Sequence, residues 1–268
     1  MRKRAETVPT GTRAAAFLCA TLAAASVVTR AAAMVGGAPP AGQGAGRSVV
    51  MILGSYGTAC TATAIARDLL LTAAHCVQPG ADYKLADTWS SPTPTLKDIT
   101  RIERDPQFEI KRLFAHLATA DVALAKLAQP LPGRFPPVPL DDATQPISAG
   151  DTFVVAGYGV TVRGDGRTGG TVRAATLIAT GTPNSLQLRL VDPHTNDERP
   201  GLGACAGDSG APTFRETGGN YTIVGVVSWS TGPKLSGGCG GLTGVTPLAS
   251  HRAWIVETAR ALGSPLAP

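Results

Sequence analysis

A lone serine in a tight, glycine-flanked turn is the residue of this 268-residue sequence whose surroundings most suggest chemistry. Ser209 lies in the run Gly207-Asp208-Ser209-Gly210, and Cys205 stands shortly before it. A serine hydroxyl is a weak nucleophile at neutral pH, so it needs a general base and an acidic group that orients the base. A catalytic interpretation of Ser209 therefore requires a histidine and an acid elsewhere in the chain.

Two further residues are candidates for those roles. His75 lies in the segment Leu71–Cys76, where an apolar strand end runs into small residues and a cysteine. Asp121 stands just before the alternating apolar run Val122–Leu127, which predicts a half-buried strand and a partly desolvated carboxylate. Taken alone, each has a simpler explanation, namely a packed or surface histidine and a solvated aspartate at a strand edge.

The first 33 residues have the composition of an export signal. Basic residues at positions 2 to 4 precede the uncharged, alanine-rich run Ala14–Val28, and Ala31-Ala32-Ala33 offers the small residues that a signal peptidase accepts. The run has 15 residues, whereas a membrane-spanning helix needs roughly 20. We expect a signal peptide over residues 1–33, cleavage after Ala33 and a secreted protein of residues 34–268. An uncleaved anchor is the alternative.

Removing that segment changes the charge balance. The whole chain has a formal net charge of +5, but residues 1–33 hold five basic residues against one acid, which leaves +1 for residues 34–268. A near-neutral surface gives no electrostatic reason to expect nucleic acid or an anionic membrane as a partner. We expect the mature chain to bind neither.

Four cysteines remain after the expected cleavage, namely Cys60, Cys76, Cys205 and Cys239. An even number suits the oxidising compartment to which export leads, and four cysteines allow three pairings, among which the sequence cannot choose. Zinc binding is the competing explanation, but no Cys-x-x-Cys or His-x-x-x-His spacing is present. We therefore expect disulfides, no metal and no cofactor.

The pattern along the mature chain is typical of an all-β protein. Short runs rich in Val, Ile, Thr and Leu are separated by turns rich in Gly and Pro. The clearest runs are Ser48–Leu53, Cys60–Ala66, Asp151–Ala156, Leu186–Val191 and Thr222–Ser228. A helical pattern is convincing only over Ala253–Leu262. The proline-rich stretch Gln129–Pro146 divides the strands into two halves and predicts a linker.

Taken together, three segments resemble the trypsin/chymotrypsin family of serine proteases, and in particular its secreted, bacterial type. They are Thr72-Ala73-Ala74-His75-Cys76, Asp121-Val122-Ala123-Leu124 and Gly207-Asp208-Ser209-Gly210, in the family's order of His, Asp and Ser. The resemblance covers residues 34–262. It implies a single protease domain over 34–268 with two six-stranded antiparallel β-barrels, at about 34–135 and about 147–248, and a C-terminal α-helix at about 250–262.

The resemblance also assigns roles at the site. His75 would take the proton of Ser209 as the hydroxyl attacks a carbonyl carbon, and would then return it to the leaving group. Asp121 would hold the imidazole in the correct tautomer. The main-chain N–H groups of Gly207 and Ser209 would bind the developing oxyanion.

The expected amino terminus at Met34 gains a role from the same resemblance. In this family the ammonium group of a newly exposed N-terminus inserts and pairs with the aspartate before the nucleophile, which is Asp208 here. Because Ala33 precedes Met34, cleavage of the single Ala33–Met34 bond would both remove the signal peptide and expose the activating N-terminus. We expect export itself to produce the active enzyme.

The primary substrate pocket and the disulfides follow from the resemblance as well. The pocket floor corresponds to Gly203, where relatives that cleave after Lys or Arg carry an aspartate. The other expected pocket residues also lack an acid, and they are Ala204, Ser228, Trp229, Ser230 and Gly244. A buried Lys or Arg would remain unpaired, so we expect cleavage after a neutral or apolar residue. The pairs that match family positions are Cys60–Cys76 and Cys205–Cys239.

These expectations converge on a secreted serine endopeptidase, a monomer that acts on protein or peptide substrates and is open to proteinaceous inhibitors. Two other classes compete with it. A weak or inactive homologue on the same scaffold would act as a binding or adhesion protein. A secreted esterase of the α/β-hydrolase type would use a similar triad, but it carries Gly-x-Ser-x-Gly and the order Ser, Asp, His, which this sequence lacks.

Overall fold

The computed structural model describes Met1 and residues 34–88 and 93–266. The predicted export segment, with its cleavage site after Ala33, lies outside the described residues. Within the described part of the chain, no helix is both long and apolar enough to cross a membrane. The helices and strands all belong to the unit Ala31–Pro268.

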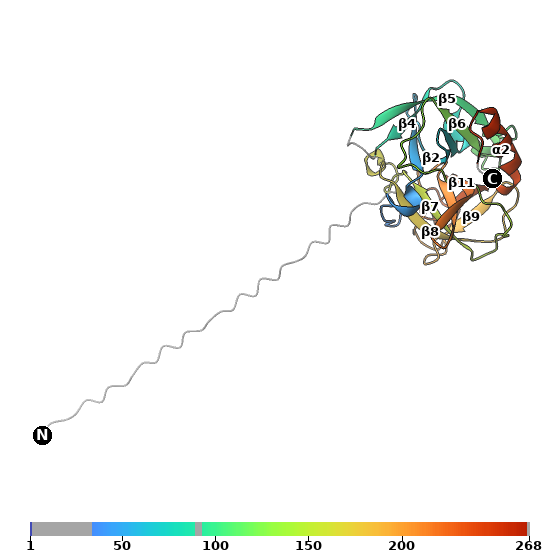
Figure 1. Cartoon of the computed structure of the whole chain (residues 1–268). Coiled ribbons are helices and arrows are strands. Elements are labelled where there is room, and N and C mark those ends of the chain that lie inside the picture. The colour runs from blue at the N-terminus through green and yellow to red at the C-terminus, as the bar shows by residue number, and fades with distance from the viewer. Residues whose placement is uncertain (2–33, 89–92, 267–268) are drawn as a thin grey trace. The chain divides into compact units, whose positions relative to one another are not determined.

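The first six strands close into a β-barrel (Figure 1). Neighbouring strands are antiparallel, in the order β1-β2-β3-β6-β5-β4, and β4 closes the barrel by pairing with β1. Three short helices accompany them, namely η1 (Gly44–Gly46), η2 (Ala74–Val77) and α1 (Ile110–Phe114). The strands are β1 (Val49–Gly54), β2 (Ala59–Ala66), β3 (Leu69–Thr72), β4 (Tyr83–Asp87), β5 (Thr95–Arg104) and β6 (Ala123–Leu127).

The second six strands close into another antiparallel barrel, in the order β10-β11-β12-β9-β8-β7, with β7 pairing with β10. Its helical elements are η3 (Gly166–Thr168) and η4 (Pro233–Leu235), and η5 (Ala249–His251) and α2 (Arg252–Ala261) follow the barrel. The expected double barrel with a C-terminal helix is thereby confirmed. The strands are β7 (Thr152–Gly157), β8 (Arg173–Ala179), β9 (Leu188–Val191), β10 (Pro212–Thr217), β11 (Asn220–Ser230) and β12 (Thr243–Pro247).

The strand that follows Asp121 is buried on both faces, so the expectation of a half-buried strand was wrong. Ala123 and Ala125 of β6 belong to the interior cluster of the first barrel. Leu124 points to the other side, into a core that it shares with Ile255 and Ala259 of α2. Figure 1 shows α2 beside the first barrel near β6. The C-terminal helix therefore covers the second face of this strand.

The segment between β6 and β7, residues 128–151, contacts both barrels. The main-chain N–H of Val138 donates to the carbonyl of Ala64 in β2 at 2.9 Å. Further along, the N–H of Asp141 donates to the carbonyl of Ile223 in β11 at 3.0 Å. The connecting segment is therefore hydrogen-bonded to both barrels and links them to each other.

Candidate active site

The pairing of β3 with β6 brings His75 and Asp121 together. Thr72, the last residue of β3, lies opposite Ala123, the first residue of β6. His75 comes three residues after Thr72, in η2, and Asp121 comes two residues before Ala123. Two residues that are 46 positions apart in sequence therefore meet at one end of the first barrel.

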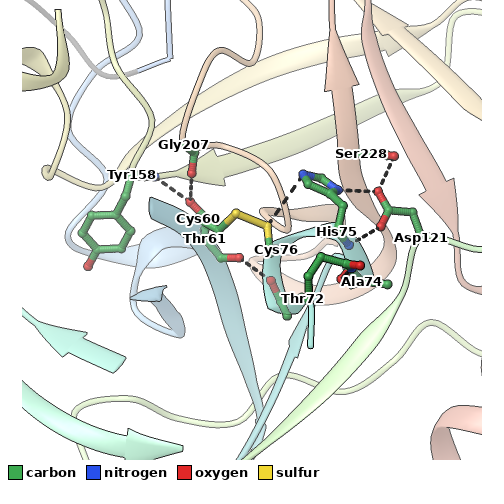
Figure 2. The surroundings of a disulfide bond; sticks show 11 residues. Cys60, Thr61, Thr72, Ala74, His75, Cys76, Asp121, Tyr158, Gly207 and Ser228 are labelled. Atoms are coloured by element: carbon green, nitrogen blue, oxygen red, sulfur yellow. Dashed lines mark hydrogen bonds and ion pairs between the residues drawn. A yellow bond between two sulfur atoms is a disulfide. The ribbon is translucent and has the colours of Figure 1, made fainter. Parts of the chain in front are cut away.

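The imidazole of His75 and the carboxylate of Asp121 form a close pair (Figure 2). His75 Nδ1 lies 2.7 Å from Asp121 Oδ2, and the main-chain N–H of His75 donates to Asp121 Oδ1 at 2.9 Å. The Asp121 side chain is fully buried, whereas that of His75 is 19% exposed. A carboxylate against Nδ1 fixes the ring and favours the proton on that nitrogen. Nε2 is then the nitrogen that can accept a proton.

Ser228 supplies a further hydrogen bond to Asp121. Its Oγ donates to Asp121 Oδ2 at 2.5 Å, and Figure 2 shows it on the side of the carboxylate away from Thr61. The family resemblance implied a place in the pocket wall for Ser228 and did not indicate this contact. The carboxylate is also completely buried rather than partly desolvated, which is tolerable because both oxygens have polar partners.

A disulfide between Cys60 and Cys76 borders the imidazole (Figure 2). It links β2 to η2 and so braces the short helix that carries His75. Ligand atoms of the two cysteines and His75 lie within 4.8 Å of one another. Sulfur atoms that are bonded to each other are not thiolates, so this group does not bind a metal in the oxidised chain. A second disulfide joins Cys205 to Cys239.

The turn that carries Ser209 docks on the first barrel. The main-chain N–H of Thr61 in β2 donates to the Ser209 carbonyl at 2.8 Å. Gly210 has a φ of 79°, and a Cβ atom there would lie 2.2 Å from Thr72 Oγ1 and 2.3 Å from the Thr61 carbonyl oxygen. A glycine is therefore required for the turn to approach β2 and β3 this closely.

Two main-chain N–H groups of this turn, those of Gly207 and Ser209, donate no hydrogen bond within the part of the chain that the structure describes. Thr61 holds the same turn from the first barrel. Its Oγ1 donates to the Gly207 carbonyl at 2.8 Å and accepts from the N–H of Tyr158 at 3.0 Å. Sequence reasoning missed Thr61, because a threonine inside an apolar strand gives no signal of such a contact.

The direct bond between Ser209 and His75 is the one element of the expected triad that is not formed. Across residues 34–88 and 93–266, no hydrogen bond joins the Ser209 hydroxyl to the imidazole, and His75 Nε2 instead lies 3.8 Å from Cys76 Sγ. Such bonds are often long in unliganded enzymes and shorten when substrate binds. Contacts of the Ser209 turn with β2 and β3 nevertheless bring it to the strands that lead to His75.

Asp208, the residue before Ser209, is fully buried. Burial raises the pKa of its carboxyl to about 7, although the main-chain N–H groups of Cys205 and Gly159 donate to it at 2.9 and 2.8 Å and lower the value in part. A Cβ atom on Gly157 would lie 2.1 Å from Asp208 Oδ1. Among the described residues, no cation forms an ion pair with this carboxylate.

Met34 is completely buried and belongs to the core of the second barrel. The main-chain N–H of Val35 donates to the Gly203 carbonyl at 3.1 Å. Gly36 follows with a φ of 85°, and a Cβ atom there would lie 2.4 Å from the Gly201 carbonyl oxygen. The segment after Ala33 therefore already packs beside the expected pocket floor. In the uncut chain, the Met34 nitrogen is part of a peptide bond and carries no charge.

The residues expected to line the primary pocket lie where β11 and β12 pair. Trp229 is opposite Gly244, and Ser230 is opposite Thr243. The N–H of Ala204 donates to Thr243 Oγ1 at 3.0 Å, which brings the segment of Gly203 and Ala204 against β12. Backbone, hydroxyl groups and one indole ring are the groups present where these two strands pair.

Comparison with known proteins agrees with this geometry. The sequence model of the family described as Trypsin matches residues 34–255. The chain is also similar to Transmembrane protease serine 9 of Rattus norvegicus, with 28% identity over 230 residues that cover 78% of this chain and 20% of that protein. It thus spans about a fifth of the length of that curated relative. Because the family match covers most of its residues, the chain belongs to the trypsin family.

Proposed function

We propose that this chain is a secreted serine endopeptidase that hydrolyses peptide bonds through an acyl-enzyme. The observation that carries the proposal is the hydrogen-bonded chain of Ser228, Asp121 and His75 close to the Ser209 turn. Two unused N–H groups in that turn are donors of the kind that an oxyanion needs. Membership of the trypsin family supports the same class of reaction.

In the proposed reaction, Ser209 Oγ attacks the carbonyl carbon of the scissile bond while His75 Nε2 takes the hydroxyl proton. The N–H groups of Gly207 and Ser209 stabilise the oxyanion, and Asp121 stabilises the imidazolium. His75 then gives its proton to the departing amine nitrogen, the C–N bond breaks, and an ester to Ser209 remains. A water molecule that loses a proton to His75 hydrolyses this ester and releases the carboxylic acid.

The same proposal includes activation by the export cut after Ala33. Cleavage there would turn the Met34 nitrogen into an ammonium group, in a segment that already packs against Gly203. Burial raises the pKa of the Asp208 carboxyl to about 7, and an ammonium group beside it would favour the charged form. N-terminal sequencing of the secreted protein tests this step. A start at Met34 is expected, and a start at any other residue would contradict it.

The proposed substrate is a protein or peptide with a neutral or apolar residue at the cleavage position. Gly203 offers no carboxylate to a Lys or Arg side chain. Asp192 lies in the preceding loop, but its carboxylate already accepts the main-chain N–H groups of Leu202 and His194, both at 2.8 Å. Asp197 is the second acid of this loop, and its Oδ1 is buried beside Gly241 without a hydrogen-bond partner among the described residues, so it is a carboxylate that a cationic side chain could still reach. Without it, a Lys or Arg side chain would be buried unpaired, at substantial cost. Proteinaceous inhibitors would occupy the same site on a monomeric enzyme.

Covalent labelling by a small fluorophosphonate tests the proposed function, because the reagent reacts with activated serines. We expect stoichiometric labelling of Ser209 in protein that starts at Met34, and loss of labelling in His75→Ala. His194→Ala is the matched control, because that ring is 84% exposed and lies 3.3 Å from Asp192. It should react like the unmodified protein. A folded protein that binds peptides without being labelled would instead support the binding or adhesion alternative.

A further inference from the structure

The hydroxyl of Thr61 in β2 has hydrogen-bond partners in two loops of the second barrel (Figure 2). It donates to the main-chain carbonyl of Gly207 at 2.8 Å and accepts from the main-chain N–H of Tyr158 at 3.0 Å. The Thr61 side chain is fully buried, so water does not compete for these contacts. One side chain of the first barrel is therefore bonded both to the Ser209 turn and to the segment beside it.

The segment that follows β7 holds the peptide unit in front of Gly207. The N–H of Val160 donates to the Ala206 carbonyl at 2.8 Å. In a trans peptide the carbonyl and the N–H point in opposite directions, so this bond turns the N–H of Gly207 away from Val160. Gly207 itself has a φ of 95°, and a Cβ atom there would lie 2.9 Å from the Cα atom of Gly159. The second barrel therefore sets the direction of this oxyanion donor.

Thr61 sets where the turn lies relative to the general base. Its hydroxyl holds the turn, and its main-chain N–H donates to the Ser209 carbonyl at 2.8 Å. Cys60, its neighbour in β2, forms the disulfide to Cys76, which adjoins His75. Hydrogen bonds and covalent bonds thus connect the turn with His75 over a few residues.

We propose that Thr61 is a positioning residue that holds the oxyanion hole in place relative to His75, so that loss of its hydroxyl lowers catalysis without weakening substrate binding. This inference rests on the proposed endopeptidase function and adds a buried residue to its machinery. The main-chain bond from Thr61 to Ser209 remains in every variant, whereas the bond to Gly207 depends on the side chain alone. Without that bond, the glycine backbone has other conformations open to it, and the two N–H donors lose their fixed direction.

Thr61→Val keeps the size and shape of the side chain and removes the hydroxyl. We expect it to lower kcat for a chromogenic peptide at least about tenfold with little change in KM, and by less than the roughly 10²- to 10³-fold that loss of a whole oxyanion donor costs. The end point of titration with the small fluorophosphonate gives the amount of active enzyme. Thr61→Ser keeps the hydroxyl and should retain most of kcat. A Thr61→Ser enzyme as slow as Thr61→Val would overturn the proposal.

A peptidyl trifluoromethyl ketone measures the oxyanion hole itself, even in a preparation that is partly misfolded. Ser209 Oγ bonds to the ketone carbon, the hydroxyl proton passes to His75, and the carbonyl oxygen becomes an oxyanion. The corresponding alcohol binds the same site but cannot undergo this addition. We expect Thr61→Val to raise the inhibition constant of the ketone at least about tenfold and to leave that of the alcohol unchanged. Equal changes for the two inhibitors would contradict a role in the oxyanion hole.

Thr63→Val is the matched control. Thr63 lies two residues further along β2, is fully buried like Thr61, and its hydroxyl has no hydrogen-bond partner among the described residues. Its removal should leave kcat and KM unchanged. Equal losses in both valine variants, or an unchanged kcat in titratable Thr61→Val, would overturn the inference alone. Absence of titration in the unmodified protein would instead overturn the proposed function.

Discussion

One extra residue in front of Met34 isolates the proposed ion pair from every other interaction in the chain. A protein that begins at Ala33 keeps all side chains of the folded unit, but its ammonium group is moved one residue away from Asp208. The carboxylate of Asp208 is then buried without a cation. In the protein that begins at Met34, the ammonium group and the carboxylate neutralise each other. The stability of the two proteins should therefore depend differently on pH.

The size of the difference follows from the pKa of Asp208. An unfolded aspartate has a pKa of about 3.9, whereas burial raises the pKa of this carboxyl to about 7 in the folded chain. Because the folded state holds the proton more tightly, the stability of the Ala33 protein falls as the pH rises from about 4 to about 7 and levels off above that. Between pH 5 and pH 8 the loss corresponds to about two pKa units, on the order of 3 kcal/mol.

Urea unfolding at pH 5 and pH 8 measures this loss in both proteins, each carrying Ser209→Ala to prevent self-digestion. With a denaturant slope of about 2 to 3 kcal/mol per molar urea, the midpoint of the Ala33 protein should drop by about 1 M more than that of the Met34 protein. The other titrating side chains are shared, so their contributions cancel in the comparison. Asp208→Asn in the Ala33 protein is the control, because it cannot ionise and should remove the additional drop.

Equal changes of midpoint in the two proteins would refute the reasoning, because the added residue would then have no effect on the environment of Asp208. Activity offers a second measurement on proteins that keep Ser209. The Ala33 protein should have a much lower kcat/KM than the Met34 protein, since the Ser209 turn loses the proposed support next to it. Full activity of the Ala33 protein would contradict the activation step even if the stabilities differ.

Three further substitutions probe the other contacts of the site and the fold. Ser228→Ala removes the 2.5 Å hydrogen bond to Asp121 and should lower kcat about 10- to 100-fold with little change in KM. Unchanged steady-state kinetics would contradict a role of this hydrogen bond in catalysis. Gly210→Ala places a methyl group 2.2 Å from a threonine hydroxyl of β3 and should destabilise the protein by about 3 kcal/mol or more in urea, so a neutral result would disprove the tight docking. Asp105→Ala leaves its partner, a His251 side chain that is only 4% exposed, without an acid. It should lower Tm on the order of 10 °C, and an unchanged calorimetric transition would show that the pair contributes nothing.

The strands that the sequence predicted are those with apolar runs between turns. The predicted runs Ser48–Leu53 and Thr222–Ser228 correspond to β1 and β11 within two residues at each end. β5 gave no such signal, because Thr95–Arg104 carries several charges and has no fully buried residue, and it is held mainly by pairing with β4 and β6. The five-residue helix α1 has no buried side chain, so it lacks the apolar stripe on which a helix prediction depends.

The local sequence was sufficient to identify which individual side chains could take part in catalysis. A serine in a turn of glycines, a histidine beside a cysteine and an aspartate before an apolar strand are recognisable from residue type and near neighbours, as are the turns that need glycine. The tertiary structure decided how these groups are surrounded. Asp121 is buried on all sides where the two barrels meet. The hydrogen bond from Ser228 and the contacts of Thr61 form in the same place, and they join residues about 100 or more positions apart in sequence. The position of the Trp229 ring on Gly244 likewise depends on strand register, which is set by the pairing of whole strands and leaves no mark on neighbouring residues in the chain.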